Sequence, residues 1–402
     1  MQDLILSIDL GTTAIKVALI DSAGELKAIS IQEYQLLTSR ASYVEERPEV
    51  YWESFKKGLQ EIRGKTNIDT QCIRALGISA QGETLFFLDK DGNPLRNAIV
   101  WMDNRAHKES NMLRNKFGDE LCYKTTGQVS FDPCWPSAKI LWVKLHEPEV
   151  FAKTAKFLLI EDYFIYRLTG RYVSEGSLLC STTYWNLTTK TWWGEMLDYL
   201  EVTVDRLPQI LEPGEAVSTI LPEVARELCI CEDIMVCTGA LDQAAGAIGV
   251  GNISEGIFSE NIGAALAICA PVREPTFDPN RAMPLHYFAI PDMYMLHTFT
   301  AGGMTLRWFR DCFCQQETDL SILLGDDSYH LMDREAALIT PGCEGLIVLP
   351  RLNGSLAPDI NSKARGVCFG FTLKHTNPNF IRSILNSMGY IIRPNMHAVT
   401  YT

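Results

Sequence analysis

Two apolar runs open the chain on either side of a short polar turn. They cover residues 4–9 and 14–21, and Gly-Thr-Thr lies between them. Branched aliphatic residues in two such runs, joined by a glycine-containing turn, predict a β-hairpin. Further along, apolar positions at Phe55, Leu59 and Ile62 recur at helical spacing and predict an amphipathic helix.

Strands and helices continue to alternate through the first third of the chain. Residues 75–80 form a short apolar run, which predicts a buried strand. Residues 85–88 and 98–101 flank an Asp-Gly-Asn-Pro turn, which predicts a second hairpin. Residues 105–230 have a mostly helical pattern.

The pattern restarts in the second half of the chain. Residues 233–239 predict a strand closed by a glycine turn, and residues 242–248 predict a helix rich in small residues. Residues 256–270 have the pattern strand, glycine turn, strand, and they loosely repeat the opening hairpin. We therefore expect an α/β protein with two similar domains facing a common cleft, residues 1–242 and residues 243–402.

The composition bears on partners and compartment. Of 402 residues, 36 are Lys or Arg and 49 are Asp or Glu, giving a formal net charge of −13. Because no basic block appears, nucleic acid is not expected as a partner. The 12 cysteines are scattered without a C-x-x-C pair, so we do not expect a zinc site with sulfur ligands. The same cysteines lead us to expect a reducing compartment. Without a basic leader or an apolar run of bilayer length, we expect a cytoplasmic protein that does not enter a membrane.

The opening hairpin carries the first candidate chemistry. Its tip, Gly11, Thr12 and Thr13, presents backbone N–H groups and two hydroxyls that could surround phosphate oxygens. Asp9 ends the first strand, where a magnesium ion bridging those phosphates would need a carboxylate. The hairpin therefore suggests ATP-dependent phosphoryl transfer, although a buried hairpin with a capped turn is an equal alternative from these residues alone.

Six segments of distinctive composition follow one another along the chain. They are residues 8–13, 98–105, 239–246, 300–311, 345–354 and, after Ala357 and Pro358, residues 364–375. In sequence and in order these segments resemble the FGGY family of carbohydrate kinases, which belongs to the actin/hexokinase/Hsp70-like ATPase superfamily. The resemblance covers nearly the whole chain and implies two ribonuclease H-like domains that flank a cleft.

The resemblance also implies roles for individual residues. Asp242 would be the general base for the substrate hydroxyl, Asp9 would orient Mg²⁺, and Lys16 would contact the nucleotide phosphates. The other residues that would bind ATP are Gly11, Thr12 and Thr13 in the first domain and Gly263 and Gly303 in the second. The residues that would bind the sugar are Gln81, Glu83, Trp101, Asp103, Asp242 and Gln243.

Several of these residues also have simpler explanations. Asp242 precedes a predicted helix and could be its N-cap, and Lys16 could be an exposed lysine on a strand. Trp101 could be an ordinary core tryptophan. Asp103 could form a salt bridge with Arg105, two residues further along.

Two departures from the family pattern bear on activity. Residues 261–265 are Asn-Ile-Gly-Ala-Ala, where the family usually carries a hydroxyl residue after the glycine. Loss of that donor would slow transfer by roughly one or two powers of ten. Pro394 is expected to interrupt the last helix, and the chain ends at Thr402, before the glycine-rich adenosine loop of the family. We therefore expect an incomplete second domain with exposed apolar surface, which favours instability or self-association as a homodimer.

The predicted function is ATP-dependent phosphorylation of a sugar or polyol hydroxyl by a xylulokinase-like carbohydrate kinase. ATP and Mg²⁺ are the expected cofactors, and a small sugar or polyol is the expected partner. The alternative is a truncated, non-catalytic sugar-binding or regulatory protein of the same fold. An actin- or Hsp70-like chaperone or filament protein would share the hairpins but would not account for residues 81–84 or 101–105.

Overall fold

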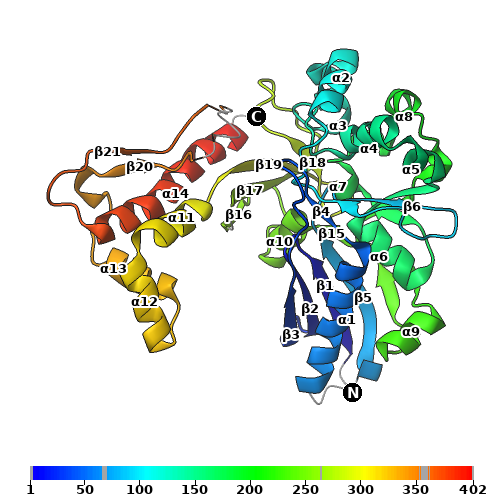
Figure 1. The fold of residues 1–402 in the computed structure, drawn as a ribbon, viewed down its shortest axis with the longest axis horizontal. Coiled ribbons are helices and arrows are strands. Elements are labelled where there is room, and N and C mark those ends of the chain that lie inside the picture. The colour runs from blue at the N-terminus through cyan, green and yellow to red at the C-terminus, as the bar shows by residue number, and fades with distance from the viewer. Residues whose placement is uncertain are drawn as a thin grey trace. The chain divides into compact units, whose positions relative to one another are not determined.

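The chain forms two compact units. The computed structural model describes residues 3–65, 70–262, 265–352, 354, 361 and 363–400 (Figure 1). The first unit comprises Met1–Ile253, Arg273–Pro275 and Leu285–Met295, and the second comprises Ser254–Val272, Thr276–Pro284 and Leu296–Thr402. The predicted domain boundary between residues 242 and 243 stays a prediction.

A mixed seven-stranded sheet forms the centre of the first unit. Its strands follow the order β13-β14-β5-β1-β2-β3, and β15 also pairs with β5. Their bounds are Leu4–Leu10 (β1), Ala14–Asp21 (β2), Leu26–Glu33 (β3), Ile73–Ala80 (β5), Ala216–Thr219 (β13), Met235–Cys237 (β14) and Ala240–Leu241 (β15). The antiparallel β1–β2 pair is the hairpin that the sequence predicted, and β5 is the predicted buried strand.

Two helices pack against one face of this sheet. Helix α1 (Pro48–Lys65) lies along β2 and β3, and α6 (Ile160–Thr169) lies along β5 and β14 (Figure 1). The rings of Trp52 and Phe55 on α1 contact the ring of Phe164 on α6 at centroid distances of 5.7 and 6.0 Å. The helix predicted around Phe55 is therefore α1, and its apolar stripe packs against the sheet and α6.

A second layer of the first unit contains a smaller sheet and most of the short helices. The sheet has the order β4-β7-β6-β8, with bounds Glu45–Glu46, Ala98–Ile99, Leu85–Leu88 and Lys156–Leu159. The helices of this layer are α2 (His107–Phe117), α3 (Asp119–Thr126), α4 (Pro136–His146), α5 (Pro148–Lys153), α7 (Gly176–Leu179) and α8 (Gly194–Leu200). Helix α9 (Pro222–Leu228) instead contacts α1, where Glu227 pairs with Lys56, and α10 (Asp242–Gly249) contacts β15 and β5 of the main sheet. The predicted hairpin of residues 85–88 and 98–101 is the β6–β7 pair.

The region from 105 to 230 contains short strands that the helical pattern did not reveal. They form two ladders, β9 (Val173–Glu175) with β12 (Gln209–Leu211) and β10 (Trp185–Asn186) with β11 (Thr191–Trp192). Two or three residues are too few to establish a period-2 pattern, so such strands leave little trace in the sequence. Short 3₁₀ turns occur at Thr70–Cys72, Val204–Arg206 and Cys343–Gly345.

In the second unit, strands precede a group of helices. Strands β16 (Ser259–Ile262) and β17 (Ala265–Val272) are antiparallel, and β17 also pairs with β19 (Tyr294–Ala301). Strand β18 (Leu285–Tyr287) belongs to the first unit. The remaining elements are α11 (Met304–Phe313), α12 (Gln315–Leu324), α13 (Ser328–Ala337), β20 (Ile347–Leu349), β21 (Val367–Phe369) and α14 (Asn377–Thr400). Their core is built from β17, the helices α11, α13 and α14, and β20, with Ile268, Phe309, Met332 and Ile381 at its centre.

The second unit also exposes many large apolar side chains. The most exposed described ones are Leu373, Leu323, Leu338, Ile322, Phe369 and Phe371. Trp308, Phe313 and Phe380 line a mainly apolar hollow of about 440 Å³ in this unit. The exposed apolar surface that the sequence led us to expect is therefore present. Among helices in the described part of the chain, none is long and apolar enough to cross a bilayer.

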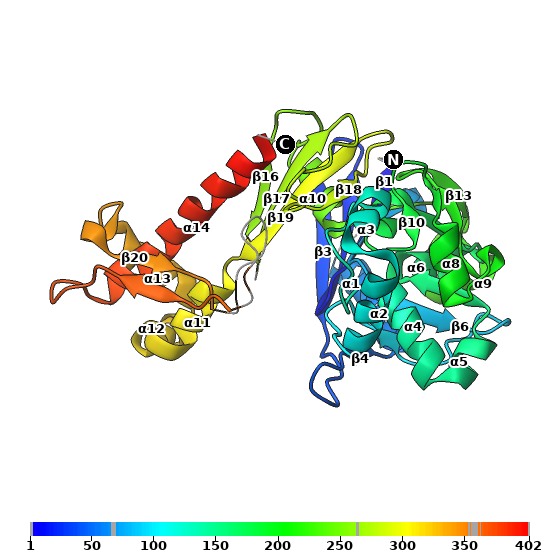
Figure 2. The same ribbon diagram turned by 90° about the horizontal axis from the view of Figure 1, so that it is seen from above.

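The prediction that Pro394 interrupts the last helix is wrong. Helix α14 continues through Pro394 and ends at Thr400 (Figure 2). Proline removes one backbone donor and usually breaks a helix, but tertiary packing can override this cost. The side chain of Asn395 is buried, and its Nδ2 donates to the carbonyl of Ile391 at 2.7 Å, while α14 packs against α11, α13 and β20.

Replacing this proline should stabilise the second unit. Pro394→Ala restores an N–H group that can donate to the Tyr390 carbonyl, so we expect unfolding to require up to about 3 kcal/mol more free energy. Chemical denaturation followed by circular dichroism measures the change. Asn395→Ala, which removes the buried amide, is the comparison variant and should lower the free energy of unfolding. A lower midpoint for Pro394→Ala would show that the proline ring itself makes a needed contact.

Candidate active site

The end of β1 places a carboxylate beside the hairpin tip. Asp9 is opposite Lys16 in the antiparallel β1–β2 pair and beside Ser79 in the parallel β1–β5 pair. Its Oδ2 accepts a hydrogen bond from Lys16 Nζ at 2.9 Å, and its Oδ1 accepts one from Ser79 Oγ at 3.0 Å. The Asp9 side chain keeps 28% of its surface exposed, so an anchored carboxylate remains accessible to a ligand.

Lys16 is both paired and exposed. Half of its side-chain surface (50%) is accessible while its ammonium contacts Asp9. The alternative of an exposed strand lysine therefore describes its position. The exposed ammonium still lies beside the hairpin tip, so its predicted contact with a phosphate stays a prediction.

The hairpin tip is held by side chains from distant parts of the first unit. Nε2 of Gln81 donates to the Gly11 carbonyl at 3.2 Å, and the Tyr34 hydroxyl donates to the same oxygen. The indole Nε1 of Trp101 donates to Thr12 Oγ1 at 2.8 Å. The hydroxyl-bearing residue that follows, Thr13, is exposed. The tip is thus a fixed loop with one accessible hydroxyl residue.

Two residues predicted to bind sugar therefore support the hairpin in this structure. Gln81 is only 2% exposed, and its amide is turned to the Gly11 carbonyl. Trp101 is partly exposed and links the hairpin to the segment that follows β7. It is not a fully buried core tryptophan. The direct contacts of both residues with a sugar stay predictions.

Lys139 is a buried cation that joins two segments of the expected sugar pocket. It lies on α4, its side chain is fully buried, and its Nζ donates to the carbonyls of Glu83 and Val100 at 3.0 Å each and of Trp101 at 3.4 Å. Burial lowers the pKa of Lys139 to about 8. Three carbonyls thus take up the three protons of the ammonium, and they fix the backbone of both segments.

Glu83 occupies an unusual backbone conformation in this turn. Its φ is 54°, in the left-handed region that residues other than glycine seldom adopt. The hydrogen bond from Lys139 to its carbonyl helps to maintain that conformation. Burial raises the pKa of the Glu83 carboxyl group, while a bond from Ser181 and the charge of Lys139 act in the opposite direction.

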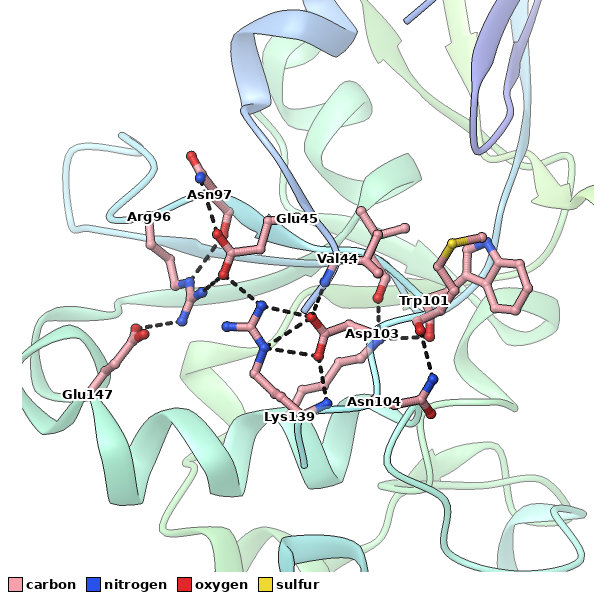
Figure 3. Close-up of polar contacts among 12 residues, drawn as sticks. Val44, Glu45, Arg96, Asn97, Trp101, Asp103, Asn104, Lys139 and Glu147 are labelled. Carbon is pink, nitrogen blue, oxygen red and sulfur yellow. Dashed lines mark hydrogen bonds and ion pairs between the residues drawn. The ribbon is translucent and has the colours of Figure 1, made fainter. Parts of the chain in front are cut away.

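Asp103 lies inside a buried ionic network (Figure 3). Arg105 Nε donates to both Asp103 oxygens at 2.9 and 3.0 Å, and the Val44 N–H donates to Oδ2 at 2.6 Å. Arg105 Nη2 also contacts Glu45 at 2.7 Å, and Arg96 contacts the same glutamate. With Asp103 fully buried, the geometry supports the salt-bridge alternative for this residue, and its direct contact with a substrate stays a prediction.

Asp242 begins helix α10 immediately after the two-residue strand β15. Leu241 is the N-cap of α10 and no side chain caps this end, so Asp242 is not an N-cap residue. Burial raises the pKa of Asp242 to about 7, and the negative charges of Glu83 and Asp9 act in the same direction. A bond from the Gln243 backbone and the Lys16 charge partly oppose this rise. These neighbours show that Asp242, Glu83, Asp9 and Lys16 share one electrostatic environment.

The other predicted residues are placed as follows. Gln243 is partly buried on α10, next to Asp242. Gly303 belongs to the second unit and is the N-cap of α11, where the first N–H groups of the helix have no intrahelical partner. Gly263 and Ala264 lie outside the described residues. Within the described part of the chain, no group of three or more His, Cys, Asp or Glu side chains could hold a metal ion.

Sequence reasoning missed several residues that support this site. Lys139 and the buried carboxylates Glu161 and Glu175 are among them. The signal for Lys139 was a charged residue within the apolar run Ala-Lys-Ile-Leu-Trp-Val of residues 138–143. A lysine there is either a surface position or a buried cation with specific partners. Only the fold decides between the two.

The first unit thus contains candidates for two of the groups that phosphoryl transfer to a hydroxyl uses. A fixed polar hairpin and a carboxylate with a raised pKa lie in one environment of an α/β unit. Comparison with known proteins gives the family. The domain described as "FGGY family of carbohydrate kinases, N-terminal domain" matches residues 4–249, and the corresponding C-terminal domain matches residues 269–401. The chain belongs to the FGGY family of carbohydrate kinases.

Individual relatives agree with this assignment. The chain is 31% identical to the xylulose kinase of Bacillus subtilis over 395 residues, which are 98% of this chain and 76% of that protein. It is 28% identical to the gluconokinase of the same organism over 392 residues, 97% of this chain and 75% of the relative. The crystal structure of ligand-bound xylulose kinase from Lactobacillus acidophilus is similar at a TM-score of 0.83 and 29% identity, covering 96% of this chain and 76% of that one. The predicted family and mixed α/β fold are confirmed.

Removing the buried ammonium should destabilise the first unit. Lys139→Met leaves the carbonyls of Glu83, Val100 and Trp101 without this donor, so we expect a loss of about 1–3 kcal/mol in the free energy of unfolding. Lys144→Met on the same helix removes an ion pair with Glu201 near the surface and should change stability by less than about 1 kcal/mol. Denaturant titration of both variants measures the two free energies of unfolding. Equal losses in the two variants would contradict the role of Lys139 in fixing the segments of Glu83 and Trp101.

Proposed function

We propose that this chain transfers the γ-phosphoryl group of ATP to a hydroxyl of a small neutral sugar, as a xylulose kinase does, with Asp242 as general base. The observation that carries the proposal is the Asp242 carboxyl group at the start of α10. Its pKa is raised to about 7 beside Asp9 and Lys16 of the hairpin. A base with a pKa near the working pH is suited to accept the proton of an attacking hydroxyl.

The hairpin supplies the binding surface for the nucleotide in this proposal. The hairpin tip presents backbone N–H groups and the exposed side chain of Thr13, and Lys16 presents an exposed ammonium. The Thr12 hydroxyl accepts a bond from Trp101 and keeps its own proton to donate. Gly11 must lack a side chain here, because a Cβ would lie 2.8 Å from the Ala14 carbonyl oxygen. In the second unit, we propose that Gly263 and Gly303 bind the phosphates of ATP.

Asp9 is the residue that would hold Mg²⁺. Its carboxylate is anchored by Ser79 and Lys16 and is still partly exposed, so it fits one contact to a hydrated ion. Mg²⁺ commonly keeps several waters and uses few protein carboxylates when phosphates supply other ligands. When bound, the ion would neutralise charge on the transferring phosphate. Asp9 also raises the pKa of Asp242, so the hairpin and the base are electrostatically linked.

The charges near Asp242 favour a neutral sugar over a sugar acid. When ionised, the three acids Glu83, Asp9 and Asp242 outnumber the two nearby cations, Lys16, which contacts Asp9, and Lys139, which contacts three uncharged carbonyls. A substrate carboxylate would meet net negative charge in this environment. We therefore favour a substrate such as xylulose over gluconate, although both kinds of kinase occur among the relatives.

Glu83, Trp101 and Gln243 are the proposed direct contacts of the sugar. Glu83 and Trp101 belong to the two segments that Lys139 fixes, and Gln243 follows the base. For Gln81 and Asp103 we propose a supporting role, because Gln81 bonds to the Gly11 carbonyl and Asp103 is enclosed by Arg105 and Val44.

Replacement of the base tests the function directly. Asp242→Asn keeps the size of the side chain but removes the proton acceptor, so kcat should fall about 10²–10⁴-fold in a coupled assay with Mg-ATP. The substrate panel is D-xylulose, D-gluconate and glycerol. Asp233→Asn, at an exposed aspartate that precedes β14, is the control and should retain full activity. If the wild type binds sugar by calorimetry but phosphorylates no member of the panel, the non-catalytic alternative replaces the proposal.

The pH dependence tests the same base in another way. Because the Asp242 pKa is raised to about 7 and the base must be unprotonated, kcat/KM should be constant above about pH 7. It should fall about tenfold per pH unit on the acid side. The charge of Lys16 lowers the pKa of Asp242, so Lys16→Met should shift the fall of kcat/KM at acid pH to higher pH. This shift is expected whatever the variant does to the constant value of kcat/KM at high pH. An acid limb near pH 4 in the wild type would mean that Asp242 has an ordinary pKa and is a poor general base.

A further inference from the structure

We propose that Glu161 and Glu175, two buried carboxylic acids behind the loop of residues 239–241, are positioning residues that fix Asp242 for proton transfer. This inference rests on the proposed role of Asp242 as base. Both residues are fully buried, and both bond to the loop, Glu161 directly and Glu175 through Ser177.

Glu161 acts on the start of the loop. It lies on α6, and its Oε1 accepts the N–H of Gly239 at 2.8 Å. A Cβ at Gly239 would lie 1.8 Å from the Ile78 carbonyl oxygen and 3.1 Å from Glu161 Oε2. The backbone at this point is therefore confined between β5 and the Glu161 side chain, and only glycine fits.

Glu175 acts on the end of the loop through one hydroxyl. Its two oxygens accept the N–H groups of Ser177 and Leu178 at 2.6 and 2.7 Å, which caps the short helix α7. The Ser177 hydroxyl donates to Glu175 Oε1 at 2.7 Å and accepts the N–H of Leu241 at 3.0 Å. Because the hydroxyl proton is engaged by Glu175, a lone pair of Ser177 is left for the residue directly before Asp242.

Strand pairing completes the restraint on the loop. β15 is parallel to β5, with Ala240 beside Ser79 and Leu241 beside Ala80. Ser79 in turn bonds to Asp9. The two acids thus hold residues 239–241 beside β5, the strand whose Ser79 also bonds to Asp9. Misplacing Asp242 by about 1 Å would cost roughly 100-fold in rate.

The chemistry of these acids argues for a role other than stability. Burial raises the pKa of Glu161 well above its ordinary value, and the neighbouring charges of Glu175 and Asp162 act in the same direction. Burial likewise raises the pKa of Glu175. Burying ionisable groups that repel one another opposes folding, and apolar residues of similar size often serve stability better. The acids are explained by their hydrogen bonds: Glu161 accepts the N–H of Gly239, and Glu175 accepts the hydroxyl proton of Ser177, whose oxygen accepts the N–H of Leu241.

A comparison of two substitutions at Glu161 tests the inference. Glu161→Ala removes the acceptor for Gly239, so kcat should fall roughly 10–100-fold while the KM for sugar and for ATP changes less than about twofold. Glu161→Gln keeps an acceptor oxygen and resembles the protonated acid, so its kcat should stay within about threefold of the wild type. A purely structural role would not produce this difference between the two variants.

Asp162→Ala is the matched control. This neighbour on α6 is also buried, but its Oδ2 accepts the N–H of Leu159, and among the described residues it forms no hydrogen bond with residues 239–241. The variant should lower the unfolding midpoint and leave the kcat of the folded enzyme unchanged. Ser177→Ala removes a single oxygen and provides a second test if Glu161→Ala does not fold. Its kcat should fall with KM unchanged.

The outcomes separate this inference from the proposed function. If Asp242→Asn keeps its activity in the same assay, the function fails and the inference fails with it. If Asp242→Asn is inactive but folded Glu161→Ala and Ser177→Ala have wild-type kcat, only the inference is overturned. An equal loss of kcat in Glu161→Gln and Glu161→Ala would also overturn it, because the acceptor oxygen would then not matter.

Discussion

The position of β5 between its neighbours is the constraint on which the arrangement of the first unit depends. β1 and β15 both run parallel to β5, and they meet its last two residues, Ser79 and Ala80. Asp9 is registered beside Ser79, and Asp242 follows the pairing of Leu241 with Ala80. Because a parallel register cannot slip by one residue without reversing every side chain, the separation of these two carboxylates is set by backbone hydrogen bonds. The side chains then need only small adjustments.

Desolvation gives the carboxylates different properties within that register. Asp242 is partly buried beside Glu83 and Asp9, and its pKa is raised to about 7. Asp9 has the ammonium of Lys16 and the hydroxyl of Ser79 as partners. The Asp242 carboxyl group is thus suited to exchange a proton near neutral pH, whereas the Asp9 carboxylate is held by an ammonium and a hydroxyl. The same residue type serves two kinds of chemistry because the partners differ.

Local patterns in the sequence were sufficient to predict the elements that carry the chemistry, but not their supports. The β1–β2 hairpin, β5, the β6–β7 pair and α10 follow from apolar periodicity and turns, and the resemblance to a family supplied the fold. Pro394 was misjudged because its local effect is outweighed by the packing of α14. The Asp103–Arg105 pair was among the alternatives that the sequence offered, but the bonds of Gln81 to Gly11, 70 residues away, and of Asp103 to Val44, 59 residues away, were not. Contacts of that range have no signature in a single sequence.

The supports share one physical principle, which is that buried ionisable side chains are bonded to backbone groups of functional loops. Lys139 donates to three carbonyls under the Glu83 and Trp101 segments, and Glu161 accepts an N–H from the loop before Asp242. Loop backbone cannot be fixed by apolar packing alone, because its polar groups require partners when water is excluded. A long side chain reaching from a helix supplies those partners without adding another backbone segment. The desolvation of Lys139 and Glu161 is therefore the cost of fixing the backbone next to the proposed base and the proposed sugar contacts, and helices α4 and α6 carry the two side chains that fix it.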